Sequence, residues 1–547
     1  MTSTGRVRER VRAQDGFSLI VVLSVMLVTS LLLVAAFTAS TGEVQTARRS
    51  TNHTRAYYAA LAGVQEYAYR LDNEPDFWET CEAVTGKTAG ARYMANGKEV
   101  ETEPGRYEVK VLRASGSTSE CEAAHPFTTA IQSSGALANT FRIESIGCTG
   151  GGTGKCETTM RGEETHSIVA TFQVTGFLDY AYFTQYEDED PSLNGESAAT
   201  CERYYAARAD AGCSEIYFGE GDSVHGPFHT DDAANITCGA VEFGRKSSEL
   251  NGMEPDLVEI KGGINVTCGT SPTINTKNKQ LTTPAKQLEP PPSDGSLALY
   301  VEAKNKFEGV THLVLNGTTN TIEVTNKGVT GPPLEWPKNG LIYVGANEKA
   351  TCTYKYQQIA SDLANEAKEE PGCGTVYVSG TYSKSLTIGA SKELIINGSL
   401  TPTGVTLGQE PSGTETLGLI ATGFVRVYHP VTEGGGVVNT KTTCTAKNAT
   451  GSMLDPWIYA AILSTSHSFT VDNDNCGDKS ELETLHVYGA IAQKFRGIVG
   501  TTGDTGYTKD YQYDERLATD EPPYFLAPLK AGWRIIRETE SAKEKEK

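Results

Sequence analysis

One uncharged segment near the N-terminus constrains this chain more than any other feature. Residues 17–39 read FSLIVVLSVMLVTSLLLVAAFTA and contain no charged side chain. As a helix, a segment of this length extends about 35 Å, which is enough to cross a hydrocarbon core of about 30 Å. The sequence therefore predicts one transmembrane helix over 17–39.

The residues before this segment predict its orientation. Residues 1–16 contain four arginines and only two acidic residues. By the positive-inside rule, this places the N-terminus in the cytoplasm and the rest of the chain outside the cell membrane. Two other interpretations stay open: a cleaved signal peptide, whose apolar part is usually shorter than this one, and a plain single-span anchor.

The helical pattern does not stop at the end of the apolar segment. Small and apolar residues recur at intervals of three and four from Ala47 to Leu71. This spacing is typical of an amphipathic helix. We therefore expect one continuous helix over 17–72, roughly 80 Å long.

Two short blocks in this region resemble a known family. Residues 16–20 (GFSLI) are similar to the processing site of type IV prepilins, and residues 55–65 (RAYYAALAGVQ) are similar to the block that follows the membrane segment in PilX-type minor pilins. The resemblance implies that a prepilin peptidase cuts between Gly16 and Phe17 and releases 1–16 as a leader. It also implies membrane lipid and other pilins as partners of the helix.

One residue departs from the pattern of that family. Most type IV pilins carry glutamate at the fifth mature position, which is Val21 here. A carboxylate in lipid is costly and is kept there to pair with a charged group. The absence of this glutamate, together with a length of 547 residues that is large for a repeating filament subunit, favours a low-copy or tip-located subunit over the main filament protein.

The overall charge argues against one class of partner. The chain has 48 Lys and Arg against 68 Asp and Glu, a formal net charge of −20. Binding to nucleic acid needs basic residues that neutralise phosphates. We therefore predict no nucleic-acid partner.

The cysteines indicate an oxidising compartment. All twelve lie in the part of the chain that is predicted to be outside: Cys81, Cys121, Cys148, Cys156, Cys201, Cys213, Cys238, Cys268, Cys352, Cys373, Cys444 and Cys476. None forms the close Cys-x₂₋₄-Cys pair that is typical of zinc sites, so disulfides are the better interpretation. The sequence leaves their connectivity open, and we expect cysteines that are neighbours in the sequence to pair.

Short β-type runs organise the part beyond the helix. Alternating runs predict a small β-domain over 73–180. Runs of three to five residues behind Gly and Asn turns then favour a right-handed β-helix (solenoid) over a sandwich or jelly roll, in two parts over 181–285 and 311–535. A triple proline in 286–310 predicts a linker with a short helix, and 536–547 is a charged tail. The fold class is thus α+β.

The part outside the membrane also resembles large PilX-like proteins of actinobacteria. The similar stretches are 177–187, 226–232, 417–421, 489–497 and 508–517. The resemblance implies a helix-anchored minor pilin or pseudopilin at the cell surface. Its β-helical head would serve pilus assembly or adhesion to a surface ligand or glycan, without catalysis.

No motif predicts a catalytic residue, a cofactor or a metal site. His225 and His229 flank a Gly-Pro pair that breaks any helix, so we expect them to form hydrogen bonds in a corner of the fold. The acidic run 187–190 lacks the spacing of a calcium loop, and we expect it on a solvated surface. The glycine-rich stretch 149–155 departs from the phosphate-binding loop at both of its ends.

Two further functions remain as alternatives to the pilin. One is a surface-tethered, carbohydrate-active β-helix enzyme, in which Lys509 and Arg516 would act with Asp510 and Asp514. We interpret these four residues instead as ion-paired structure near the C-terminal end of the fold. The other alternative is a plain membrane-anchored adhesin that does not assemble into a filament.

Overall fold

The computed structural model divides the chain into two compact units. The first, called the helix unit, comprises Met1–Ser133, Thr140–Gln173 and Arg534–Lys547, and the second, called the strand unit, comprises Ser134–Asn139 and Val174–Trp533. The structure describes residues 15–74, 76–88, 92–95, 98–101, 104–114, 121–124, 130, 140–149, 156, 164–208, 212–237, 240–250, 255–267, 273–274, 287–352, 371–431, 447–474, 476–477, 481–500, 505–529 and 532–540.

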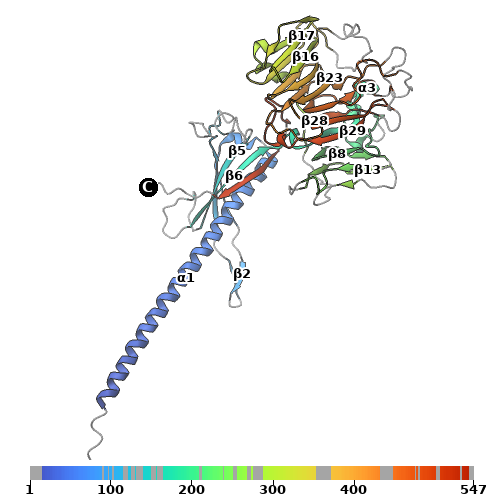
Figure 1. The fold of residues 1–547 in the computed structure, drawn as a ribbon. Helices are drawn as coiled ribbons and strands as arrows, with labels where there is room; N and C mark the ends of the chain where they lie inside the picture. Colours follow the sequence, from blue (N-terminus) through green and yellow to red (C-terminus); the bar gives the residue numbers. More distant parts are fainter. Residues whose placement is uncertain are drawn as a thin grey trace, which may run out of the picture. The chain divides into compact units, whose positions relative to one another are not determined.

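A single long helix, α1 (Asp15–Asn73), runs through the first part of the helix unit (Figure 1). Its continuity confirms the expected helix. Within α1, Leu19–Ala36 has a mean hydropathy of 2.9 and is not buried by any other part of the structure. By length and composition, this is a candidate membrane span, although a signal sequence has the same properties.

The second half of α1 packs on an antiparallel sheet of the same unit. The sheet has the order β1 (Val84–Lys87), β4 (Arg106–Leu112), β5 (Thr140–Cys148), β6 (Thr165–Val174) and β30 (Trp533–Glu540). The side chains that α1 buries on it are Ala56, Ala59, Ala60, Val64, Tyr67 and Leu71. Because several of these are alanines, the helix backbone comes close to the sheet.

Other short elements complete the helix unit. They are the 3-10 turn η1 (Phe77–Thr80) and the hairpin of β2 (Arg92–Ala95) and β3 (Lys98–Glu101). The strand β30 covers the beginning of the segment 536–547, so this part of the charged tail adds a strand to the sheet.

The strand unit is built mainly from parallel ladders, which Figure 1 shows as stacked arrows. The strands of the longest ladder are, in spatial order, β15 (Lys306–Glu308), β20 (Leu341–Gly345), β22 (Leu386–Ala390), β24 (Leu417–Ala421), β26 (Trp457–Ser464), β28 (Thr484–Arg496), β7 (Tyr182–Glu189), β9 (Phe228–Thr230) and β12 (Val258–Ile260).

Further parallel ladders alternate with this one along the chain. One comprises β16 (Thr311–Asn316), β21 (Thr375–Tyr382), β23 (Glu393–Pro402), β25 (Val425–Val427) and β27 (Phe469–Val471). Another continues from the first halves of β26 and β28 to β29 (Thr508–Tyr513), β8 (Ser223–His225), β11 (Glu242–Phe243) and β14 (Thr273–Ile274). The strands β10 (Ala234–Ile236) and β13 (Ile264–Val266) also pair in parallel.

Small elements connect or cap these ladders. The antiparallel strands are β17 (Thr321–Asn326), β18 (Val329–Thr330) and β19 (Leu334–Glu335), which follow β16. The helical turns are η2 (Phe177–Asp179), α3 (Pro191–Asn194), α4 (Ala198–Cys201), α5 (Tyr205–Arg208), η3 (Gly295–Leu299), η4 (Ala303–Asn305) and η6 (Glu515–Ala518). The short helix that was expected in 286–310 is thus a pair of 3-10 turns.

The core of the strand unit follows the register of the longest ladder. Buried residues that occupy equivalent positions on successive strands form one column: Ile342, Ile388, Leu419, Ile462, Ile491, Tyr182, Phe228 and Val258. The repeated runs of Val, Ile and Leu in the sequence supply many of the side chains that stack on one another in this core.

The chain enters the strand unit in the middle of this ladder. Its first strand, β7, lies between β28 and β9, so it pairs with a strand that follows it by about 300 residues. The N–H of Thr175 donates to the carbonyl of Gly532 at 2.6 Å, so the beginning and the end of the unit are also in contact.

Four disulfides join cysteines that are neighbours in the sequence: Cys81–Cys121, Cys148–Cys156, Cys201–Cys213 and Cys352–Cys373. These are four of the six expected pairs. Cys476 is also disulfide-bonded. Cys238, Cys268 and Cys444 lie outside the described residues, so the other two expected pairs stay predictions.

Candidate functional site

A row of aromatic and polar side chains crosses neighbouring strands of the strand unit. The register aligns Tyr459 on β26, Tyr488 on β28, Gln512 on β29 and His225 on β8. Side chains at equivalent positions of paired strands lie on the same face. Tyr459 and Tyr488 stack with ring centroids 5.0 Å apart, and we call these four residues the aromatic row.

A second row runs beside it, two residues earlier on each strand. It aligns Trp457, His486, Asp510 and Ser223. The rings of Trp457 and His486 stack at 3.7 Å between centroids. His486 is fixed by hydrogen bonds between its Nδ1 and Asp510 Oδ2 (2.6 Å) and between its Nε2 and Asp455 Oδ1 (3.2 Å).

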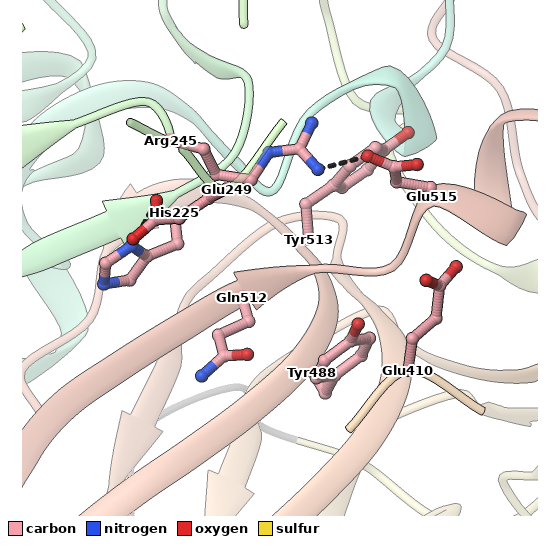
Figure 2. Close-up of a pocket in the computed structure, with 8 residues that line it drawn as sticks. All are labelled: His225, Arg245, Glu249, Glu410, Tyr488, Gln512, Tyr513 and Glu515. Atoms are coloured by element: carbon pink, nitrogen blue, oxygen red, sulfur yellow. Dashed lines mark hydrogen bonds and ion pairs between the residues drawn. The ribbon is translucent and has the colours of Figure 1, made fainter. Parts of the chain in front are cut away.

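A pocket of about 310 Å³ opens where the aromatic row changes from rings to an amide. Figure 2 shows Gln512 between Tyr488 and His225, and these three residues form the floor. Glu410 stands beside Tyr488 at one wall. The other walls are formed by Arg245, Glu249, Tyr513 and Glu515.

Interactions behind the pocket hold its walls in place. The guanidinium of Arg245 donates to Asp256 at 2.6 Å and also pairs with Glu515. The loop 403–416, which carries Glu410, is fixed at its far end because Arg516 donates to the carbonyl of Gly413 at 2.7 Å.

The same loop is fixed beside Glu410. The N–H of Gly408 donates to the hydroxyl oxygen of Tyr459 at 2.9 Å, so this part of the loop covers the first ring of the aromatic row. Tyr459 is consequently buried, whereas Tyr488 is only partly buried.

The pocket is electrostatically negative. Glu249, Glu410 and Glu515 line it together with Arg245 and His225, and His225 Nδ1 lies 3.9 Å from Glu249 Oε2. Burial disfavours the charged form of Arg245, but hydrogen bonds to Asp256 and Glu515 outweigh burial and raise its pKa. Burial, together with the Glu410 carboxylate, raises the pKa of Tyr488 above its ordinary value.

The four residues that a carbohydrate-active site would need do not converge. Lys509 is partly buried and pairs with Asp222 at 2.7 Å, and desolvation lowers its pKa. Asp510, the next residue on β29, lies on the opposite face and holds His486. Arg516 pairs with Asp514 at 2.7 Å. The ion pairs Lys509–Asp222 and Arg516–Asp514 agree with a structural role.

The two histidines of the sequence analysis have different surroundings. His229 is fully buried, with its Nδ1 2.9 Å from Glu259 Oε2 and its Nε2 3.1 Å from Asp231 Oδ1. His225 instead lies at the pocket, with its Nε2 3.1 Å from Ser223 Oγ. Both histidines form hydrogen bonds in the strand unit, and they contact different partners.

The prediction that the acidic run 187–190 is solvated was wrong. These residues have exposed fractions of 0 to 2%, because β7 is a central strand. Glu187 pairs with Arg496 at 2.9 Å, and Asp188 with Arg208 at 3.4 Å. Burial raises the pKa of Asp188 to about 8, although Arg208 opposes this shift.

Two other candidates lie at the limits of the described residues. Gly16 and Phe17 belong to the first turn of α1, and the surroundings of neither residue are described. Of the glycine-rich stretch, 150–155 lies outside the described residues, and the cysteines on either side, Cys148 and Cys156, form a disulfide.

No pattern in the sequence predicts the pocket. Tyr488, Glu410 and Arg245 belong to strands and loops that are far apart in the chain. The only local signal was the alternation in LHVYG and YQY, which indicates strands with aromatic side chains.

Comparisons of this chain with protein-family models, with curated proteins and with solved structures found no match.

Proposed function

We propose that this chain is a PilX-type minor pilin or pseudopilin, anchored in the cell membrane by α1 before it is assembled into a filament. One observation carries the proposal. The same helix is apolar and uncovered by other parts of the structure over Leu19–Ala36, yet it buries Ala56, Ala60 and Val64 against an antiparallel sheet. A cleaved signal peptide would not need a helix that continues without a break into a folded unit.

The proposal extends to the rest of the chain. We propose that the strand unit is a right-handed β-helix displayed outside the cell. Its parallel ladders, which alternate along the chain, favour this over an antiparallel sandwich, and parallel crossovers are nearly always right-handed. The disulfides fit an oxidising exterior. Other pilins, a prepilin peptidase and membrane lipid are the proposed partners of the helix.

Processing of the N-terminus tests this function. The full chain is expressed in a bacterial membrane together with a prepilin peptidase, and the mature protein is sequenced from its N-terminus. We expect the mature chain to begin at Phe17 and to be methylated there. Gly16→Leu is expected to abolish cleavage, whereas Gly5→Leu, a matched change within the leader, leaves it intact.

Other outcomes identify the alternatives. A mature N-terminus after Ala36 or Ala39 would mean a signal peptide. An uncut chain in the presence of an active peptidase would leave a plain anchored adhesin. Either result overturns the pilin proposal.

A further inference from the structure

The floor of the pocket interrupts a stack of rings. Tyr459 and Tyr488 stack in the aromatic row, but the next position is Gln512, and an imidazole returns at His225. Neighbouring strands lie about 4.8 Å apart, so a flat group placed over Gln512 would be about 5 Å from the ring on each side. The floor therefore has the dimensions for one planar group between two rings.

The side chain of Gln512 leaves this position open. Its Nε2 donates to both carboxylate oxygens of Asp510, each at 3.2 Å. The amide is thus held toward the second row and away from the line between Tyr488 and His225. The face of Tyr488 that does not stack on Tyr459 borders the pocket.

The charges around this opening determine whether it favours a cationic or an anionic ligand. Arg245 is already matched by Asp256 and Glu515. Glu410 is exposed and has no hydrogen bond or ion pair with any part of the chain that the structure describes. Glu249 lies 3.9 Å from His225 Nδ1 and accepts from the N–H of Lys246 at 2.8 Å, so Glu410 is the carboxylate of the pocket that is left for a ligand. Its negative charge repels anions and attracts cations.

Planarity and positive charge together point to one chemical group. A guanidinium is flat, stacks on aromatic faces and forms paired hydrogen bonds with a carboxylate, whereas an ammonium is a compact point charge. We propose that this pocket binds the guanidinium of an arginine side chain carried by a basic peptide segment of a partner protein. The guanidinium lies over Gln512 against the ring of Tyr488 and pairs with Glu410.

The pocket is built before the ligand arrives. The loop that carries Glu410 is held by Arg516 and by Tyr459, and Glu515 begins the turn η6 beside it. Because the backbone of these walls is already held, binding orders the arginine side chain and the side chain of Glu410 but not the loop. The proposal concerns the strand unit alone and does not depend on the processing or assembly of the helix.

The test uses the disulfide-bonded full chain in detergent and three short probes. These are acetyl-Gly-Arg-Gly-amide, the same peptide with citrulline, which has the shape of arginine without its charge, and the same peptide with lysine. Binding is measured by isothermal titration or by ligand-observed NMR. We expect the arginine peptide to bind at least about tenfold more tightly than the citrulline peptide, and more weakly as salt rises. The lysine peptide should be intermediate.

Variants tie the binding to the pocket. Glu410→Gln keeps the shape of the wall and should weaken arginine binding about tenfold. Tyr488→Leu should weaken it by several-fold, while Tyr488→Phe, which keeps the ring, should preserve it. Glu335→Gln changes another exposed glutamate, on β19, and should have no effect. Circular dichroism and resistance to proteolysis confirm that each variant is folded.

Three results would each overturn the proposal. The first is a failure of the arginine peptide to bind the folded wild type. The second is equal binding of the citrulline and arginine peptides. The third is binding that Glu410→Gln leaves unchanged. A neutral oligosaccharide that binds with the same dependence on Tyr488 and Glu410, in place of the arginine peptide, would identify a glycan pocket instead.

Discussion

The contact between α1 and its sheet can be tested with one added carbon. Gly147 on β5 lies directly against the helix backbone, where a Cβ atom would be 2.0 Å from the carbonyl oxygen of Ala56 and 2.3 Å from the nitrogen of Ala60. Both are backbone atoms that cannot rotate away. Gly147→Ala therefore forces the helix and the sheet apart.

The size of the effect follows from the same distances. Ordinary contact with a Cβ begins at 3.4 Å, so the helix must retreat by roughly 1.4 Å. The hydrogen bond from Ser145 Oγ to the carbonyl of Ala60, now 2.7 Å, is then lost. Overpacking costs about 1–3 kcal/mol and the lost bond about 1 kcal/mol, while alanine in a strand recovers about 0.5–1 kcal/mol relative to glycine. The net loss is about 2 kcal/mol of docking free energy.

Hydrogen exchange measured by mass spectrometry on the full chain reports this loss. A change of about 2 kcal/mol corresponds to roughly 30-fold faster exchange if the helix opens locally. We expect the increase in α1 around Ala56–Val64 and in β5. Ser145→Ala removes only the hydrogen bond and should give a smaller increase, about fivefold.

The matched control is Gly331→Ala. A Cβ at Gly331 would have its nearest neighbour at 4.0 Å, so the same substitution meets no obstacle there. If Gly147→Ala left exchange in α1 within threefold of the wild type, the close approach of helix and sheet would be refuted. An equal effect from Gly331→Ala would show that the change is unspecific.

Further predictions concern the strand unit. Ile462→Ala removes a buried member of the core column and should lower the free energy of unfolding in urea by about 2–5 kcal/mol. Burial raises the pKa of Asp294 to about 7, so the folded state retains a proton that the unfolded chain has lost, and stability should fall as pH rises from about 4 to 7. Asp294→Asn should remove this part of the pH dependence, as urea midpoints across that range will reveal. Arg496→Met leaves Glu187 buried without its partner and should cost about 3–5 kcal/mol, whereas the double variant with Glu187→Met should recover much of that loss in urea unfolding.

Local patterns account for what the sequence predicted well. The helix depends on an uninterrupted apolar segment followed by small residues at three- and four-residue spacing, and both signals lie within one stretch of chain. The four disulfides close loops between cysteines 8 to 40 residues apart. The strands Leu341–Gly345 and Leu386–Ala390 match short β-type runs.

Non-local pairing accounts for what the sequence could not predict. The run 187–190 has the composition of a surface loop, but β7 lies between β28 and β9, and Arg496 and Arg208 reach Glu187 and Asp188 from elsewhere in the chain. The pocket is likewise assembled from residues between His225 and Glu515. Which residues become neighbours depends on the register of β28, β29 and β8, and no local pattern encodes that register.

The seam between β7 and β28 shows what fixes such a register. A contact between aliphatic side chains, such as Ile462 on Ile491, has no directional requirement, whereas a hydrogen-bonded polar pair does. Across the seam, Arg496 donates to Glu187 at 2.9 Å and Gln493 donates to the hydroxyl of Tyr182 at 3.0 Å. A slip would leave these groups buried without partners, at a cost of about 3–5 kcal/mol for the charge alone. The buried acidic run therefore fixes a single register in which β28 can pair with β7.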